Sequence, residues 1–117
     1  GGCPDDGKPA PKTSKVTFQV DMTGVDTTGG VFLQGVFNGW CGDCAPLAEG
    51  ENGVWSSLVP LLPGGYQYKY TTDGWNGLVE ALPATCDPFP NDEFQNRFVE
   101  VGDTDMTLAI HAWEICP

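Results

Sequence analysis

The residues of this chain that could do chemistry are its acids and its tryptophans. Asp and Glu number 16, enough for the carboxylate pair of a glycoside hydrolase, but they lie mostly in turns and in the leader. The single histidine, His111, lies in an apolar run near the C-terminus, where a structural role is typical. No serine stands in the sharp strand-to-helix turn of a hydrolase nucleophile. A small glycosidase is therefore an alternative function and not the favoured one. Neither a cofactor nor a metal ion is expected.

Two tryptophans stand in settings that suit ligand binding. Trp40 follows an apolar run and the turn signal Asn38-Gly39, and Trp75 follows a second run and Asp73-Gly74. An indole held at a strand end can cap the core or present a flat apolar face to a ligand. Sugar rings carry apolar C–H faces that stack on indoles, while nearby polar groups bond the hydroxyls. Because there are two such tryptophans, with Lys69 between them in sequence, a carbohydrate ligand and a core-capping role are equally well supported.

The elements that must position these residues are predicted to be strands. Residues 15–22 alternate apolar and polar side chains, which is typical of a half-buried strand. In residues 66–72 three tyrosines share one face, and Lys69 shares the other with Gln67. Further strands are expected at 31–37, 54–61, 94–101 and 106–113, with 78–82 as a candidate short strand.

The composition predicts one all-β domain. The 16 glycines and 10 prolines fall between short apolar runs, which is typical of a β-sandwich. The 117 residues predict a single domain at 15–117 after a linker or tail at 1–14. A formal net charge of −11 argues against a nucleic-acid partner, because phosphate binding needs a basic surface. No apolar run approaches the ~20 residues of a membrane span.

Five cysteines in so short a chain indicate an oxidising compartment, and hence a secreted or cell-surface protein. Cys41, Cys44, Cys86 and Cys116 lie in the predicted domain and allow three pairings, of which Cys41–Cys44 with Cys86–Cys116 is favoured. A thioredoxin-like redox motif or half of a zinc site at Cys41 and Cys44 is the weaker interpretation, because no βαβ pattern surrounds them. Cys3, which follows two glycines, is either a lipoprotein anchor or a linker cysteine.

Four motifs occur in a fixed order along the chain. They are GVFNGW at 35–40, PGGYQYKY at 63–70, DGW at 73–75 and NRFV at 96–99. In this order they resemble the starch- and glycogen-binding modules of the early-set immunoglobulin-like type, such as the glycogen-binding domain of the AMP-activated protein kinase β subunit. The resemblance implies an immunoglobulin-like antiparallel β-sandwich of about seven to eight strands.

The resemblance also implies a site and a partner. In that family two tryptophans stack on glucose rings while a lysine and an asparagine bond hydroxyls; by position these are Trp40, Trp75, Lys69 and Asn96. The family's modules bind and do not catalyse. They hold a polysaccharide near an attached or partner glycoside hydrolase or other polysaccharide-degrading domain. An immunoglobulin-like interaction domain is the further alternative.

The chain departs from the family pattern in its cysteines. Cys41 and Cys44 directly follow Trp40, and Cys86 lies in a long segment before Asn96. Such cysteine-bearing versions look like modules of secreted polysaccharidases of marine bacteria, or of their surface glycan-capture proteins. Because the departures flank the site, the ligand stays open between an α-glucan, a β-glucan and a sulfated algal galactan, with a glucan favoured.

Two basic residues bear on the charge of the ligand. Lys69 and Arg97 are the only lysine and arginine after residue 15, and both are expected near the site. Either the two form a cationic pocket for a sulfate or carboxylate, or Lys69 bonds neutral hydroxyls while Arg97 pairs with an acid. Since the net charge of −11 repels a polyanion, a neutral glycan is favoured.

Overall fold

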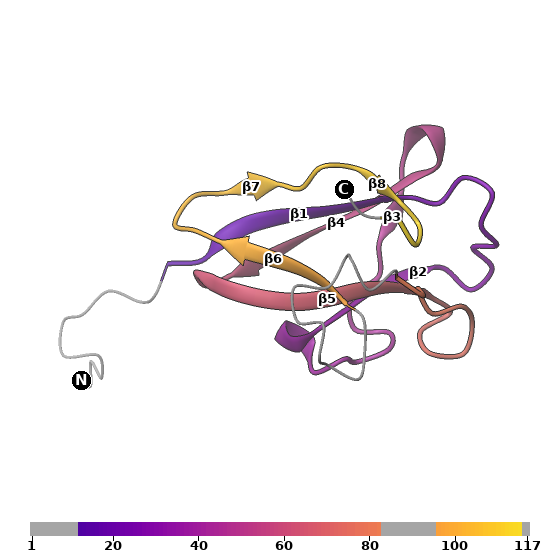
Figure 1. Cartoon of the computed structure of the whole chain (residues 1–117), viewed down its shortest axis with the longest axis horizontal. Coiled ribbons are helices and arrows are strands. Elements are labelled where there is room, and N and C mark those ends of the chain that lie inside the picture. The colour runs from indigo at the N-terminus through magenta and orange to yellow at the C-terminus, as the bar shows by residue number, and fades with distance from the viewer. Residues whose placement is uncertain (1–11, 83–95, 116–117) are drawn as a thin grey trace, which may run out of the picture.

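The computed structural model describes residues 12–82 and 96–115, which fold into two packed β-sheets (Figure 1). The described elements, eight strands and two 3₁₀ turns, are β1 Ser14–Asp21, β2 Val31–Gly35, η1 Val36–Asn38, β3 Ala48–Glu49, η2 Glu51–Gly53, β4 Val54–Leu61, β5 Gly64–Thr72, β6 Arg97–Val101, β7 Met106–Thr107 and β8 His111–Ala112. No helix in the described residues has the length and apolar character needed to cross a membrane. The architecture confirms the expected all-β, immunoglobulin-like sandwich of about eight strands.

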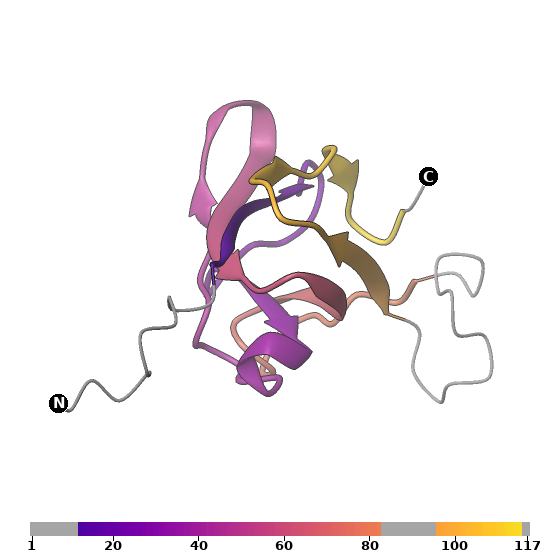
Figure 2. The same cartoon turned by 90° about the vertical axis from the view of Figure 1, so that its left-hand side faces the viewer.

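The two sheets differ in strand direction. The first has the order β3-β4-β1-β7, with β8 also on β1, and the second has the order β2-β5-β6. β1 pairs antiparallel with β4 from Ser14 opposite Leu61 to Asp21 opposite Val54. β7 and β8 instead run parallel to β1, after the chain has passed from β6 in one sheet to the other (Figure 2). The other strand pairs are antiparallel, as expected of this sandwich, and these two short strands are the exception.

The core lies between the sheets and is built by alternating residues. Val16 and Phe18 of β1 are fully buried, and Tyr68 and Tyr70 of β5 meet them from the second sheet. The rings of Phe18 and Tyr68 pack edge to face with centroids 5.0 Å apart. Such a pair stabilises the fold by about 0.5–1.5 kcal/mol beyond its buried area. The tyrosines therefore mark the inner face of the second sheet, and Lys69 belongs to its outer face.

Two of the four tryptophans pack against this core. Trp55 of β4 and Trp113, which follows β8, are both half-buried there. His111 is half-buried in β8, where it pairs with Val20 of β1. Trp40 and Trp75 are not members of the core cluster in the described residues, so they are the indoles left for a ligand.

Other differences from the expected strands concern an early end, a strand that does not form and a strand that is divided. β2 stops at Gly35, because the following residues turn into η1. Residues 78–82 form no strand and contribute a single bridge, from Val79 to Thr71. The strand expected at 106–113 is split into β7 and β8.

Candidate functional site

An open pocket of about 350 Å³ lies where the outer face of the second sheet meets two loops. Its described lining residues are Trp40, Lys69, Trp75, Val79 and Asn96. Four of the five are residues that the sequence assigned to ligand binding. The pocket therefore brings together the loop after η1, the middle of β5, the loop after β5 and the residue before β6.

The turn that carries Trp40 is fixed by its own side chains. Asn38 accepts a hydrogen bond from the Gly35 amide at 3.2 Å and donates one from Nδ2 to the Leu33 carbonyl at 3.0 Å. A Cβ on Gly35 would collide with the ring of Phe37, so any larger residue would force that ring to move. Trp40 then adopts a left-handed φ of 58°, which is uncommon for a non-glycine residue, and its amide bonds the Gly35 carbonyl at 3.0 Å. The motif spacing thus follows from a turn that closes on itself and holds the indole.

The loop after β5 joins Trp75 to Trp40. Asp73 and Gly74 have left-handed φ values of 52° and 62°, and the Asp73 amide bonds the Gly30 carbonyl at 2.9 Å. The indole Nε1 of Trp75 donates to the Trp40 carbonyl at 2.8 Å, and the Trp75 residue is 44% exposed. Because this bond uses the polar edge of the ring, the apolar face remains for a ligand.

A disulfide between Cys41 and Cys44 closes the loop beside these tryptophans and confirms that predicted pairing. Buried Gln34 of β2 holds the loop, since its Nε2 donates to the Gly42 carbonyl at 2.7 Å. Gly42 lies against Trp75, because a Cβ added there would stand 2.9 Å from Cδ1 of the indole. The cysteine loop therefore supports Trp75, and its sulfurs are not available as thiolate ligands for zinc.

The remaining cysteine predictions fall outside the described residues. Cys3, Cys86 and Cys116 all lie there, so the Cys86–Cys116 bridge and the anchor at Cys3 stay predictions. Residues 94 and 95, the expected start of the strand seen from Arg97, lie there as well.

Lys69 and Asn96 supply the hydrogen-bonding groups of the pocket. Tyr68 lies opposite Arg97 at the end of the β5–β6 ladder, and Lys69 and Asn96 are the next residues on the two segments. Their exposed fractions are 9% and 7%. Nδ2 of Asn96 donates to Oε1 of Gln67 at 3.0 Å, which orients the amide. An ammonium and a carboxamide so placed can bond hydroxyl groups of a bound molecule.

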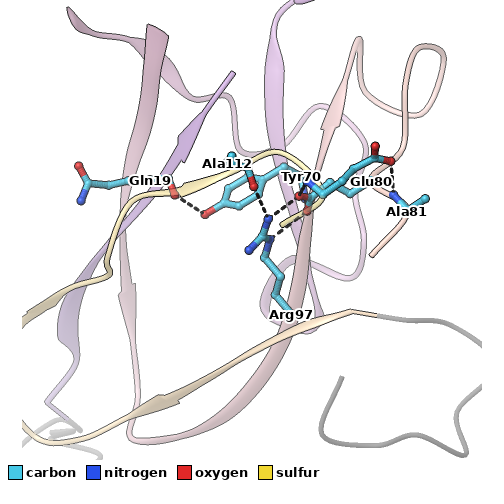
Figure 3. A network of polar contacts seen from close by, with 7 residues as sticks. Gln19, Tyr70, Glu80, Ala81, Arg97 and Ala112 are labelled. Atoms are coloured by element: carbon cyan, nitrogen blue, oxygen red, sulfur yellow. Dashed lines mark hydrogen bonds and ion pairs between the residues drawn. The ribbon is translucent and has the colours of Figure 1, made fainter. Parts of the chain in front are cut away.

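Arg97, the fifth residue predicted to bind the ligand, does not line the pocket. Its side chain lies on the inner face, where Nη2 and Nε bond the Glu80 carboxylate at 2.6 and 3.1 Å (Figure 3). The guanidinium also donates to the Ala112 carbonyl at 3.1 Å and lies 5.4 Å from the centroid of the Tyr70 ring. Strand residues alternate between faces, so Arg97 points inward with Val99. The assignment of Arg97 to the site is corrected accordingly: it pairs with an acid.

The Glu80 carboxylate is the centre of this buried network. In addition to the ion pair, it accepts hydrogen bonds from the amides of Tyr70 at 3.1 Å and Glu114 at 2.8 Å. The Glu114 side chain in turn accepts from the Ala81 amide at 2.8 Å. The network joins β5, β6 and the segment after β8. These three parts of the chain supply the hydrogen-bond partners of the buried Glu80 carboxylate.

The ion pair also fixes two residues of the pocket. Glu80 directly follows Val79, and Arg97 directly follows Asn96. The ion pair between Glu80 and Arg97 therefore holds together the two segments that carry Val79 and Asn96. Burial lowers the pKa of Arg97, but the hydrogen bond and charge of Glu80, with smaller contributions from the tyrosines, outweigh it and raise that pKa. Arg97 is therefore charged across the physiological range.

Three contributors to the site were not found from the sequence. Val79 lies in an irregular segment with no local signal of its role. Gly42 supports Trp75 only through the folding of the cysteine loop. Gln34 had a signal, since it is a polar residue inside an apolar strand run and is fully buried.

Comparison with known protein families identifies the type of domain that contains this pocket. Residues 26–90 match the family model of carbohydrate-binding module 48, described as the isoamylase N-terminal domain. The match covers more than half of the chain and includes Trp40, Lys69, Trp75 and Val79. The chain belongs to carbohydrate-binding module family 48. As a family-48 module it is a carbohydrate-binding domain, and the resemblance stated from its four motifs is confirmed.

Individual relatives of this family-48 module are much longer enzymes. Over 57 residues it is 40% identical to the 1,4-alpha-glucan branching enzyme GlgB of Vibrio cholerae serotype O1, covering 49% of this chain and 8% of the enzyme. Over 85 residues it is 41% identical to GlgB of Mycobacterium ulcerans, covering 72% of this chain and 11% of the enzyme. A glycoside hydrolase family 15 glucoamylase from Hypocrea jecorina shares the fold, with a TM-score of 0.58 at 19% identity, over 92% of this chain and 18% of the glucoamylase. The chain thus spans about a tenth of the two branching enzymes.

Proposed function

We propose that this module binds a neutral α-glucan of the starch or glycogen type, without catalysing its conversion, and keeps it near an attached or partner enzyme. The observation that carries the proposal is the meeting of Trp40, Trp75, Lys69 and Asn96 in one open pocket. The relatives named 1,4-alpha-glucan branching enzymes support an α-glucan over a β-glucan or a galactan. In these enzymes the matching segment is a small part of a catalytic chain, and the proposal gives this module the same setting or a separate partner enzyme.

The chemistry of the pocket supports a neutral sugar. The two indoles offer flat apolar surfaces, and Lys69 and Asn96 offer donors for hydroxyls. Among the described lining residues Lys69 is the only charged one, and none is a carboxylate. In the part of its lining that the structure describes, the pocket therefore has neither the acid pair of a glycosidase nor the clustered cations that bind sulfate.

The compartment is a further part of the proposal. The Cys41–Cys44 disulfide supports a module that works in an oxidising environment, secreted or at the cell surface. If the protein expressed inside cells has the disulfide reduced and binds glycan as well as the oxidised protein, this support is lost.

Native affinity gels test the ligand class. Gels cast with glycogen, soluble starch, laminarin or a sulfated galactan are expected to retard the protein only with glycogen and starch. Trp75→Ala should lower the affinity by about 1–3 kcal/mol, as the loss of an aromatic anchor does at interfaces, without unfolding the protein. A matched control is Leu58→Ala, which truncates an apolar residue that is 57% exposed on β4 in the other sheet. Retardation by the galactan alone, or full binding by Trp75→Ala, would contradict the proposal.

A further inference from the structure

A second hollow, of about 510 Å³, adjoins the pocket. Its lining includes Phe32, Gly42, Asp43, Asp73, Trp75 and Asn76. Within the described part of the chain, Trp75 is the only residue that lines both hollows. The indole therefore stands between them, with the Trp40 hollow on one side and the hollow lined by Asp43 and Asp73 on the other.

The two hollows offer complementary hydrogen-bonding groups. The first contains the Lys69 ammonium, a donor, whereas the second contains two carboxylates, which are acceptors, beside an amide and the Phe32 ring. Hydrogen bonds with one ionised partner are about twice as strong as neutral ones. Sugar hydroxyls can donate to Asp43 and Asp73, while a sulfate would be repelled, because no lysine or arginine is in the described lining of this hollow.

The walls of the second hollow are held in place before any ligand arrives. The Asp73 amide bonds the Gly30 carbonyl and the Asn76 amide bonds the Asp73 carbonyl, each at 2.9 Å. The opposite wall is fixed by Gln34, which bonds the Gly42 carbonyl at 2.7 Å. In the described residues no hydrogen bond or ion pair engages the Asp73 carboxylate. Preformed walls reduce the ordering that binding requires, which favours their use as a binding surface.

We propose that the second hollow extends the glucan site past Trp75, an inference that rests on the proposed function. One neutral chain stacks in the first hollow, passes the indole and places its next sugar units where Asp43 and Asp73 accept bonds from their hydroxyls. The module therefore distinguishes glucans by length. Oligosaccharides that reach both hollows bind more tightly than those that fill only the first.

Calorimetric titration with maltotriose and maltoheptaose tests this extension. Asp43→Ala removes one carboxylate, and Asp73→Gly removes the other while suiting the left-handed backbone, with a φ of 52°. Each variant should lower the maltoheptaose affinity about 3- to 10-fold and leave maltotriose within roughly twofold. The control Asp103→Ala removes an exposed carboxylate between β6 and β7 and should change neither affinity.

The outcomes separate the extension from the function on which it rests. Equal losses for both sugars, or no loss for either, in folded Asp43→Ala and Asp73→Gly would overturn the extension while leaving the first hollow as the site. No binding of either sugar by the wild-type protein would defeat the proposed function, and the extension with it. Thermal unfolding of each variant shows whether its fold is intact.

Discussion

Lys69 and Arg97 lie on neighbouring strands, one residue apart in the ladder, but on opposite faces of the same sheet. Lys69 faces outward and lines a pocket with two tryptophans. Arg97 faces inward, where Glu80 holds it at 2.6 Å in a buried ion pair. The position of a residue in the strand alternation, rather than its charge, therefore decides whether its side chain lines the pocket or enters the interior.

The two faces also differ in what a substitution changes. On the inner face the charged groups are buried and paired, so removing one leaves another without its partner and lowers the stability of the fold. On the outer face Trp75 is open to solvent, so its loss is expected to affect binding more than folding.

Arg97→Ala is expected to have the largest effect. It leaves the Glu80 carboxylate buried without its counter-ion, which should lower the free energy of unfolding by about 3–5 kcal/mol. Chemical denaturation measures this value. Lys15→Ala is the control, since it removes an exposed cation from β1 and should change stability by less than about 0.5 kcal/mol. Equal stability of the two variants would show that the ion pair does not hold the inner face.

The buried tyrosines predict a loss of stability in alkali. Burial, offset in part by Arg97, raises the pKa of Tyr68 from 10.0 to about 12. Above pH 10 the unfolded chain therefore releases this proton before the folded one does, and stability falls as the pH rises from 10 towards 12. At about 1.4 kcal/mol per pKa unit, the loss approaches roughly 2–3 kcal/mol.

Denaturation at several pH values between 8 and 12, with tyrosinate absorbance recorded in parallel, checks this expectation. Tyr68→Phe removes one of the two buried phenols and should reduce the pH dependence, while Tyr70, whose pKa burial also raises, accounts for the part that stays. If the absorbance of the folded wild-type protein shows all three tyrosines ionising near pH 10, the inner face is open to water and the contrast between the faces fails.

On the outer face, Trp40→Ala and Trp75→Phe separate stacking from positioning. Trp40→Ala removes a ring but keeps the carbonyl that receives the Trp75 indole, so affinity for maltoheptaose should fall by about 1–3 kcal/mol. Trp75→Phe keeps a ring and loses the N–H, so about 0.5–1.5 kcal/mol is expected. Calorimetry on both proteins measures the difference. A larger loss for Trp75→Phe would mean that the hydrogen bond, rather than the rings, decides binding.

The smallest effect expected is that of Lys69→Met, which keeps an unbranched chain and removes the ammonium. The loss of a hydrogen bond to a neutral hydroxyl should lower affinity by about 0.5–1.5 kcal/mol. Added salt should change wild-type binding little, because the Debye length of about 8 Å at physiological ionic strength screens charges but not stacking. Affinities at low and physiological salt test this, and a steep decline with salt would indicate an anionic ligand instead.

Much of the site could be predicted because its signals are local. The bounds of β4 follow from one apolar run, and the alternation in β5 placed the tyrosines and Lys69 on opposite faces. The turns before Trp40 and Trp75 follow from glycine, asparagine and aspartate at fixed spacings. Arg97 was misassigned although the same alternation, continued back from Val99, points it inward.

Other features depend on contacts between distant parts of the chain. Most strand positions, the face shared by the three tyrosines and the two indoles after turns could be predicted from the sequence alone, because they depend on neighbours a few residues away. The tertiary structure was needed to show that the Trp75 indole bonds the Trp40 carbonyl, that Val79 lines the pocket, and that the last strands run parallel to β1. It also decided that Glu80, an acid in an irregular segment, is buried against Arg97. Each of these depends on how two segments dock, and docking is set by the packing of the whole core rather than by local spacing.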